Sequence, residues 1–454
     1  MNRLRPCLLA VALCGSIGAA HAATVIRGAR VIDGTGSPPR NDVTLVIDGE
    51  RISLMGQGLR AKMPEGTRVI DYSGKTIIPG LVSDHSHIGS VDGVKSGLPA
   101  LYTRDNALRQ LRQWRAYGVT TVTSLGVNDP AVFYPLRADL HAGKADGADL
   151  FGADRGIGVP NGAPPAKMMK VGANQLDRPS TPDEARAAVD GAAQRGTDLV
   201  KVWVDDFNGS LPVKMKPEIW RAVIDEAHAK HLRVAAHIYY LDDAKRLVDD
   251  GVDILAHGVR DQPVDADFVA AMKKHGTWYI PTLDLNKAAY IYARHPGWMD
   301  QPFFRHAVQP DLARQFADGA WLDKVQNNGS AKINEEALKT NLANVKALFD
   351  AGVKIGFGTD SGAMPLRIPG FAEHRELALL VDAGLTPLQA INIATQRAAE
   401  LLGLDDRGVL APGKRADFVV LDADPSQDIE ASTKIDAVWQ RGRQVAAGVD
   451  SFAP

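Results

Sequence analysis

Six ionisable side chains, far apart in the chain, each lie in or directly after a short apolar run. They are His85, His87, Lys201, His237, His257 and Asp360. The runs that carry the last four span 199–204, 234–236, 252–256 and 353–358. Buried parallel strands have this near-continuous apolar character, and functional side chains in a barrel of such strands gather at the strands' carboxyl ends. The pattern therefore predicts a metal centre at one end of a parallel barrel.

A pair of histidines and one aspartate could hold a first metal ion. His85 and His87 are two residues apart, so on a strand both imidazoles point to the same side. Asp360 lies in Gly-Thr-Asp-Ser-Gly at the end of the last predicted strand, where its carboxylate could bind metal and take a proton from bound water. A single histidine is more often structural, and the Asp360 segment could be a simple turn. All six groups fall at or near predicted strand ends, and this coincidence favours a metal site over separate structural roles.

Lys201 is unusual because it interrupts the apolar run Leu199–Val204. Burial lowers the pKa of a lysine, which makes its neutral amine available. A neutral amine can add carbon dioxide, and the resulting carbamate can act as a carboxylate that bridges two metal ions. The alternative is an edge-strand charge that discourages pairing with another chain.

The elements that position these residues alternate strand, helix, strand through residues 76–405. This order predicts an α/β fold, a (β/α)₈ TIM barrel of right-handed βαβ units. One connection, 284–333, is long, rich in aromatic residues and follows the predicted seventh strand. Such a segment could be a lid over the site, a peripheral insert or a contact in an oligomer.

The two ends of the mature chain have a different character. Residues 23–75 alternate short β-type runs with turns, and residues 406–454 repeat this style. We expect both segments to meet in one small β-sandwich beside the barrel.

The first 22 residues predict a secretory signal peptide. Arg3 and Arg5 precede an apolar stretch, 7–18, and Ala20-His21-Ala22 is an A-x-A cleavage signal. A lipid attachment at Cys14 is the weaker alternative. We therefore expect a periplasmic or secreted protein. Both cysteines, Cys7 and Cys14, lie in this segment, so metal in the mature chain would be held by histidine, carboxylate or modified lysine.

Composition narrows the partners. The chain has 454 residues, 45% of them hydrophobic, with a net charge of −2. This balance fits an ordinary globular protein and carries no basic bias toward nucleic acid. No apolar run is long enough to span a membrane. The expected partner is a small-molecule amide substrate, and a homo-oligomer is left open.

Short motifs around the six residues resemble the amidohydrolase superfamily, in particular its imidazolonepropionase-like and Xaa-Pro dipeptidase-like branch. The motifs are Ile-Ile-Pro-Gly-Leu-Val at 77–82, Val-Ala-Ala-His at 234–237, Gly-Val-Asp at 251–253 followed by His-Gly at 257–258, and Gly-Lys-Arg-Ala-Asp-Phe at 413–418. The resemblance implies two Zn²⁺ ions. His85, His87 and Asp360 would bind one, His237 and His257 the other, and carboxylated Lys201 would bridge them.

We therefore expect a dinuclear zinc amidohydrolase that cleaves the amide bond of a dipeptide or N-acyl amino acid with a metal-bound hydroxide. Asp360 would carry the proton, and Tyr239, two residues after His237, would contact the substrate and stabilise the oxyanion. Arg260 is a candidate for binding a substrate carboxylate. The alternatives are a lactonase, a carbamate hydrolase or a phosphotriester hydrolase with the same metal site, and a non-catalytic metal-binding barrel.

Overall fold

The computed structural model describes residues 23–59, 66–165 and 170–449. The predicted signal peptide, 1–22, lies outside the described residues, as do the last five residues of the predicted C-terminal β segment. Where the structure describes the chain, no helix combines the length and apolar character needed to cross a bilayer.

The centre of the molecule consists of parallel strands. Three form one sheet, in the order β10-β9-β6, and five form another, β11-β12-β13-β14-β15. Their bounds are β6 Leu81–Ser86, β9 Val119–Leu125, β10 Asp149–Ala153, β11 Val200–Trp203, β12 Val234–His237, β13 Ile254–Ala256, β14 Trp278–Ile280 and β15 Lys354–Ile355. Nearly every residue in them is buried, as the apolar runs predict.

Isolated bridges link the two parallel sheets at both seams. Ala153 pairs with Leu199, and Ser86 pairs with Ser361. The arrangement is TIM-barrel-like, but the described strands do not form the single closed (β/α)₈ sheet that the sequence predicts. At the second seam β15 has only two residues, and β6 is joined instead to the segment that follows β15, through backbone hydrogen bonds such as His87 N to Ser361 O at 2.8 Å.

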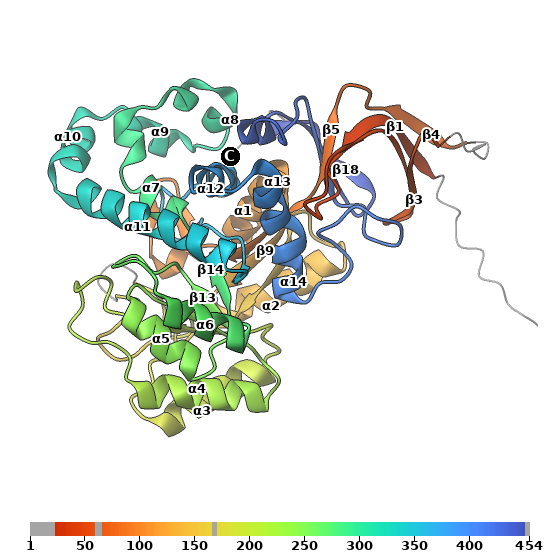
Figure 1. Cartoon of the computed structure of the whole chain (residues 1–454). Coiled ribbons are helices and arrows are strands. Elements are labelled where there is room, and N and C mark those ends of the chain that lie inside the picture. The colour runs from red at the N-terminus through yellow and green to blue at the C-terminus, as the bar shows by residue number, and fades with distance from the viewer. Residues whose placement is uncertain (1–22, 60–65, 166–169, 450–454) are drawn as a thin grey trace, which may run out of the picture.

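Helices follow the parallel strands and cover them (Figure 1). The main ones are α1 Arg104–Ala116, α2 Pro130–His141, α3 Pro182–Gln194, α4 Pro217–Ala229, α5 Leu241–Asp249, α6 Ala266–His275, α11 Ser330–Asp350, α12 Phe371–Asp382, α13 Pro387–Asn392 and α14 Ala398–Leu402. Several starts are encoded locally. Helix α3 begins with a capping box in which Thr181 and Glu184 satisfy each other's backbone N–H groups, with Pro182 in the first turn.

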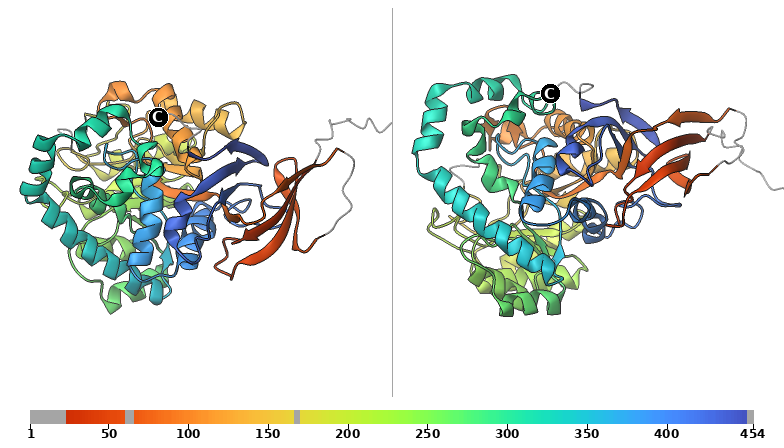
Figure 2. Two further views of the ribbon diagram at one scale, coloured as in Figure 1. Left: turned by 90° about the horizontal axis from the view of Figure 1, so that it is seen from above. Right: turned by 45° about the horizontal axis from the view of Figure 1, so that its top comes forward.

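The two chain ends meet in one mixed eight-stranded sheet that projects from the barrel in both views of Figure 2. Its strands are β1 Thr24–Val31, β2 Arg40–Asp48, β3 Arg51–Gln57, β4 Arg68–Asp71, β5 Thr76–Pro79, β16 Phe418–Leu421, β17 Ile435–Gln440 and β18 Arg443–Ala446. Strand pairing thus confirms that the ends associate but does not confirm a two-sheet sandwich. Strand β5, which the sequence assigns to the barrel, pairs with β1 and β16 in this sheet.

The 284–333 connection is a chain of short helices. They are α7 Asp284–Ala288, η2 Ile291–Arg294, η3 Gly297–Asp300, α8 Pro302–Arg305, α9 Pro310–Phe316 and α10 Gly319–Asn327. Its aromatic residues pack on one another, with Tyr292 stacked on Phe316 and Trp298 against Phe371 of α12. The middle of the connection is therefore a packed helical insert on the barrel.

Candidate metal centre

His85, His87 and Asp360 form a buried cluster with the spacing of metal ligands. His85 Nε2 lies 3.3 Å and His87 Nε2 3.0 Å from the same Oδ1 of Asp360. One donor atom from each of the three residues lies within 4.8 Å of the others. Two ligands of a tetrahedral zinc ion, with bonds of about 2.0–2.1 Å, lie about 3.3 Å apart. The cluster therefore fits a divalent ion.

His237 and His257 extend this cluster. The ring centroids of His85 and His257 are 4.5 Å apart, and those of His257 and His237 are also 4.5 Å apart. Burial lowers the pKa of both rings, most strongly for His257, and the neighbouring His85 lowers that pKa further. Neutral imidazole is the form that binds metal.

Lys201 lies in β11 with its side chain fully buried. Within the described chain, its Nζ has no hydrogen-bond partner. Burial lowers the pKa of Lys201 to about 7, although Asp360 and Asp205 act in the opposite direction. Gly126, at φ +86°, makes room here, because a Cβ at this position would come within 3.3 Å of Lys201 Cγ and 2.6 Å of the Trp203 ring.

These residues fit a pair of metal ions. Among the described residues, neither ring nitrogen of His85 has a hydrogen-bond partner, although Nε2 lies 3.3 Å from Asp360 Oδ1, and Lys201 Nζ has none either. Buried polar groups are normally paired, and an orphaned set of nitrogen bases beside a carboxylate is what a cation site requires. The structure thus brings the six predicted ligands to one end of the parallel strands, while the role of each stays a prediction.

Asp360 is held in an unusual way. Its backbone is left-handed, at φ 61°, and its second carboxylate oxygen pairs with Arg367. Burial alone would raise its pKa, but the Arg367 guanidinium and the neighbouring His85 and His87 outweigh that effect and hold the pKa well below its usual range. Asp360 is therefore a carboxylate near neutral pH. Arg367 was not predicted, because nothing local to this loop residue indicates that it turns back toward Asp360.

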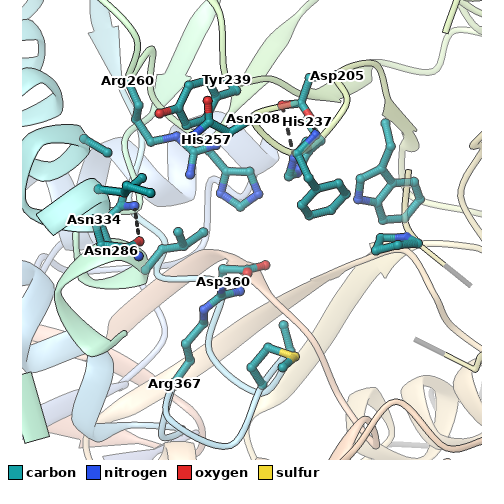
Figure 3. Close-up of a pocket in the computed structure, with 18 of the residues that line it drawn as sticks. Asp205, Asn208, His237, Tyr239, His257, Arg260, Asn286, Asn334, Asp360 and Arg367 are labelled. Atoms are coloured by element: carbon teal, nitrogen blue, oxygen red, sulfur yellow. Dashed lines mark hydrogen bonds and ion pairs between the residues drawn. The ribbon is translucent and has the colours of Figure 1, made fainter. Parts of the chain in front are cut away.

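A cavity of about 270 Å³ opens beside this cluster. Figure 3 shows Asp360 and Arg367 on one side of it, with His257, His237, Tyr239 and Arg260 on the other. The Arg260 guanidinium lies 4.8 Å from the centre of the Tyr239 ring and donates a hydrogen bond to Ile238 O at 2.9 Å. Both predicted substrate contacts, Tyr239 and Arg260, thus line the same cavity as four of the six predicted ligands, His87, His237, His257 and Asp360.

The rest of the cavity wall is mixed. Its apolar residues are Pro165, Trp203, Phe207, Leu285, Ile333, Ala337, Ala363 and Met364. Its amide side chains are Asn208, Asn286 and Asn334. Leu285, Asn286 and Ile333 belong to the 284–333 insert, so both ends of the insert contribute to the cavity.

Helix α12 supports the metal cluster through two buried glutamates that sequence reasoning missed. Glu373 accepts hydrogen bonds from the Ser83 hydroxyl at 3.1 Å and from the Thr359 and Ser361 hydroxyls at 3.0 and 2.7 Å. Ser83 lies in β6, two residues before His85, and Thr359 and Ser361 are the chain neighbours of Asp360. Glu376 accepts the backbone N–H groups of Leu283 and Asp284 at 2.8 and 2.7 Å.

Comparison with known proteins identifies the family. The model of the amidohydrolase family matches residues 76–445, so the chain belongs to that family. It is 25% identical to an imidazolonepropionase of Deinococcus deserti, over 86% of this chain and 88% of that protein. It is 24% identical to a 5-methylthioadenosine/S-adenosylhomocysteine deaminase of Bacillus cereus, over 86% of this chain and 83% of that protein.

The fold has solved counterparts. A crystal structure of a Xaa-Pro dipeptidase with bound methionine superposes with a TM-score of 0.73 at 24% identity, covering 93% of this chain and 99% of that one. The family and the site together define an enzyme, a hydrolase acting on carbon–nitrogen bonds.

Proposed function

We propose that the protein is a dinuclear zinc amidohydrolase that cleaves the amide bond of a small substrate bearing a carboxylate, of the dipeptide or N-acyl amino acid type. The observation that carries the proposal is Lys201. Its buried amine, on the second residue of β11, has no hydrogen-bond partner in the described structure. It lies close enough to His85, His237 and Asp360 for their charges to affect one another's pKa values. A carbamate on Lys201 would supply two anionic oxygens at that point.

Each residue has a defined task in this proposal. His85, His87 and Asp360 would hold one ion, His237 and His257 the other, and carboxylated Lys201 both. Bound there, the metals would polarise the scissile carbonyl and lower the pKa of the attacking water. Asp360 accepts a proton from that water and returns it to the leaving nitrogen. Tyr239 faces the cavity, where its hydroxyl would donate to the oxyanion.

One guanidinium group of the cavity supports an anionic substrate. Arg260 and Arg367 line the cavity together with the carboxylates of Asp205 and Asp360, and Arg367 is paired with Asp360. Arg260 is buried, and its Nε has no partner among the described residues, so it keeps a donor for a carboxylate. Apolar residues on the remaining wall would contact the uncharged part of the substrate.

Another electrophile is the alternative. A lactone, carbamate or phosphotriester could react at the same centre, because the ligands do not distinguish these groups. The Nε of Arg260, unpartnered in the part of the chain that the structure describes, favours the carboxylated amide. A non-catalytic role is disfavoured because the full ligand set is kept.

The test is metal content followed by paired substrates. Zinc is measured by elemental analysis, then removed with dipicolinate and restored, and hydrolysis is assayed on N-acyl amino acids, dipeptides and their carboxamide analogues, which lack the carboxylate. We expect two zinc ions per chain, zinc-dependent turnover and a strong preference for the free acid. Turnover without metal, or preference for lactones or phosphotriesters, would contradict the proposal.

We also propose export to the periplasm or medium. The Arg3/Arg5 and Ala20-His21-Ala22 pattern supports cleavage after Ala22. Intact-mass analysis of protein produced with its full leader should give a chain beginning at Ala23. A product that keeps Met1 or Asn2 would refute this proposal.

A further inference from the structure

Three histidines of the candidate centre each have one ring nitrogen beside a group that is not a predicted metal ligand. His87 Nδ1 lies 3.3 Å from Gly126 O, and His257 Nδ1 lies 2.8 Å from Thr282 Oγ1. In both, Nε2 is left for the centre. His237 differs, because its Nε2 is the nitrogen beside such a group, 3.3 Å from Oδ2 of Asp205. For His237, the nitrogen left for the centre is Nδ1.

Asp205 is buried, with 1% of its surface exposed, although its position in an Asp-Asp pair after β11 reads as a solvated face. Figure 3 shows it on the side of the His237 ring that faces away from Asp360. Its Oδ1 accepts the Phe207 N–H at 2.9 Å. Its Oδ2 accepts no hydrogen bond among the described residues, and its neighbour is His237 Nε2 at 3.3 Å. One carboxylate oxygen is thus fixed by the backbone, and the other is free to accept a hydrogen bond from Nε2 of His237.

The carboxylates of Asp205 and Asp206 also shape the loop that follows them. Phe207, Asn208 and Gly209 all have left-handed backbones, at φ 51°, 56° and 76°. Such a run is unfavourable for non-glycine residues and persists only where other contacts hold it. Two carboxylates provide those contacts. Asp205 Oδ1 accepts the Phe207 N–H at 2.9 Å, and Asp206 Oδ1 accepts the Gly209 N–H at 2.8 Å.

We infer that Asp205 is a positioning residue that holds the Nε2–H of His237 and so presents Nδ1 of this ring to a metal ion. A carboxylate in this position fixes the tautomer and orientation of the ligand and raises its basicity, and removing such a partner typically costs about 10- to 100-fold in metal affinity. The metal part of this inference rests on the proposed function, but the tautomer does not.

The experiment compares Asp205→Asn with Asp206→Asn. Both variants remove one negative charge from the same loop, but Asp206 accepts hydrogen bonds from the Gly209 N–H and the Tyr240 hydroxyl and, in the described part of the chain, contacts no histidine. The tautomer of His237 is read in metal-free, ¹⁵N-histidine-labelled protein at pH 8 by long-range ¹H–¹⁵N NMR, with His237→Gln to assign the signal. Zinc affinity is measured by competition with a chelator.

We expect the Nε2–H tautomer in the wild type and in Asp206→Asn. Asp205→Asn should lose about 10- to 100-fold in affinity for one zinc ion, while Asp206→Asn stays close to the wild type. An Nδ1–H tautomer, or equal losses in the two variants, would overturn the inference. If the wild type shows the Nε2–H tautomer but binds fewer than two zinc ions, the dinuclear proposal fails and the role of Asp205 in orienting His237 stands.

Discussion

At the scale of single residues, Lys201 and Asp360 carry the most specific chemistry. A lysine with a pKa of about 7 is roughly half neutral at neutral pH, whereas an exposed lysine is almost fully charged. Only the neutral amine adds carbon dioxide. The burial that makes Lys201 costly as a cation is therefore the property that suits it to carry a carbamate.

Replacing Lys201 tests this role directly. Lys201→Ala supplies no oxygens, and Lys201→Arg keeps a positive charge that repels metal ions. Both variants should bind fewer zinc ions and lose at least about a hundredfold in turnover, more than a supporting residue costs. Formate or acetate added with zinc should partly restore Lys201→Ala but not Lys201→Arg. A crystal structure or ¹³C NMR under labelled bicarbonate that finds a plain amine at full metal load would contradict the bridge.

Asp360 is suited to a conservative test. Its left-handed backbone is tolerated by asparagine, so Asp360→Asn should fold without added strain. The variant cannot take a proton, and we expect kcat to fall at least about a hundredfold with little change in KM. Zinc content must be measured alongside, because Asp360 is also a predicted ligand. Near-normal kcat at full zinc content would remove Asp360 from proton transfer.

At the scale of elements, α12 supports the candidate metal centre through hydrogen bonds to the segments that carry its residues. Glu373 and Glu376 are three residues apart, so both side chains leave the same face of the helix. One fixes the hydroxyls around His85 and Asp360, and the other fixes the backbone that follows Thr282, the partner of His257. The ligands thus depend on a helix that contributes none of them.

Glu373→Gln should weaken this support. A carboxamide keeps one acceptor oxygen, so several buried donors, including Trp114 Nε1 at 3.0 Å, lose a charged acceptor. We expect the free energy of unfolding to fall by about 2–4 kcal/mol, with lower zinc affinity, in urea titrations of the metal-free and zinc-loaded protein. Glu400→Gln is the matched control, because its single contact with Arg397 at 3.1 Å is half exposed and contributes about 0–1 kcal/mol. Equal effects of the two substitutions would argue against a special role for Glu373.

The six candidate ligands could be singled out in the sequence because each lies in or just after a short apolar run, which is a local pattern. Such a pattern could not reveal Glu373, Glu376 or Arg367, since their partners lie on other elements and only the packed fold brings them together. The burial of Asp205 could not be predicted either, because an Asp-Asp pair after a strand looks the same whether the first side chain turns inward or outward. The terminal strands were expected, but their pairing in one sheet is a long-range property.

At the scale of the whole molecule, buried polar contacts fasten the terminal segments to the barrel. Asp149, at the start of β10, pairs with Arg407 at 2.7 Å, Arg415 at 2.6 Å and Arg441 at 2.9 Å. Burial would raise the pKa of Asp149, but these three guanidinium groups outweigh it and hold the pKa at about 2. The cluster therefore stays ionised throughout the physiological range, and the C-terminal segment stays joined to the parallel sheet.

His374 makes a second link of this kind, one that is sensitive to pH. Its Nε2 lies 2.9 Å from Tyr117 O, which accepts only, so Nε2 carries the proton, and Nδ1 lies 2.9 Å from the Ser432 hydroxyl. The ring thereby joins α12 to the end of α1 and to the C-terminal helix η5, Ile429–Thr433. Burial lowers the pKa of His374 to about 4, and the charge of Arg375 adds to the effect.

This link predicts a loss of stability in mild acid. The unfolded chain, with a histidine pKa of about 6.5, binds a proton that the folded chain refuses until about pH 4, so the free energy of unfolding falls as the pH drops through this window. For His374 alone the loss between pH 7.5 and 5 should be about 2 kcal/mol. Urea unfolding of metal-free wild type and His374→Gln at both pH values isolates this part, because the other histidines titrate equally in both proteins. The variant should be less stable at pH 7.5 but lose about 2 kcal/mol less on acidification, and parallel losses in the two proteins would show that His374 is not the group that titrates.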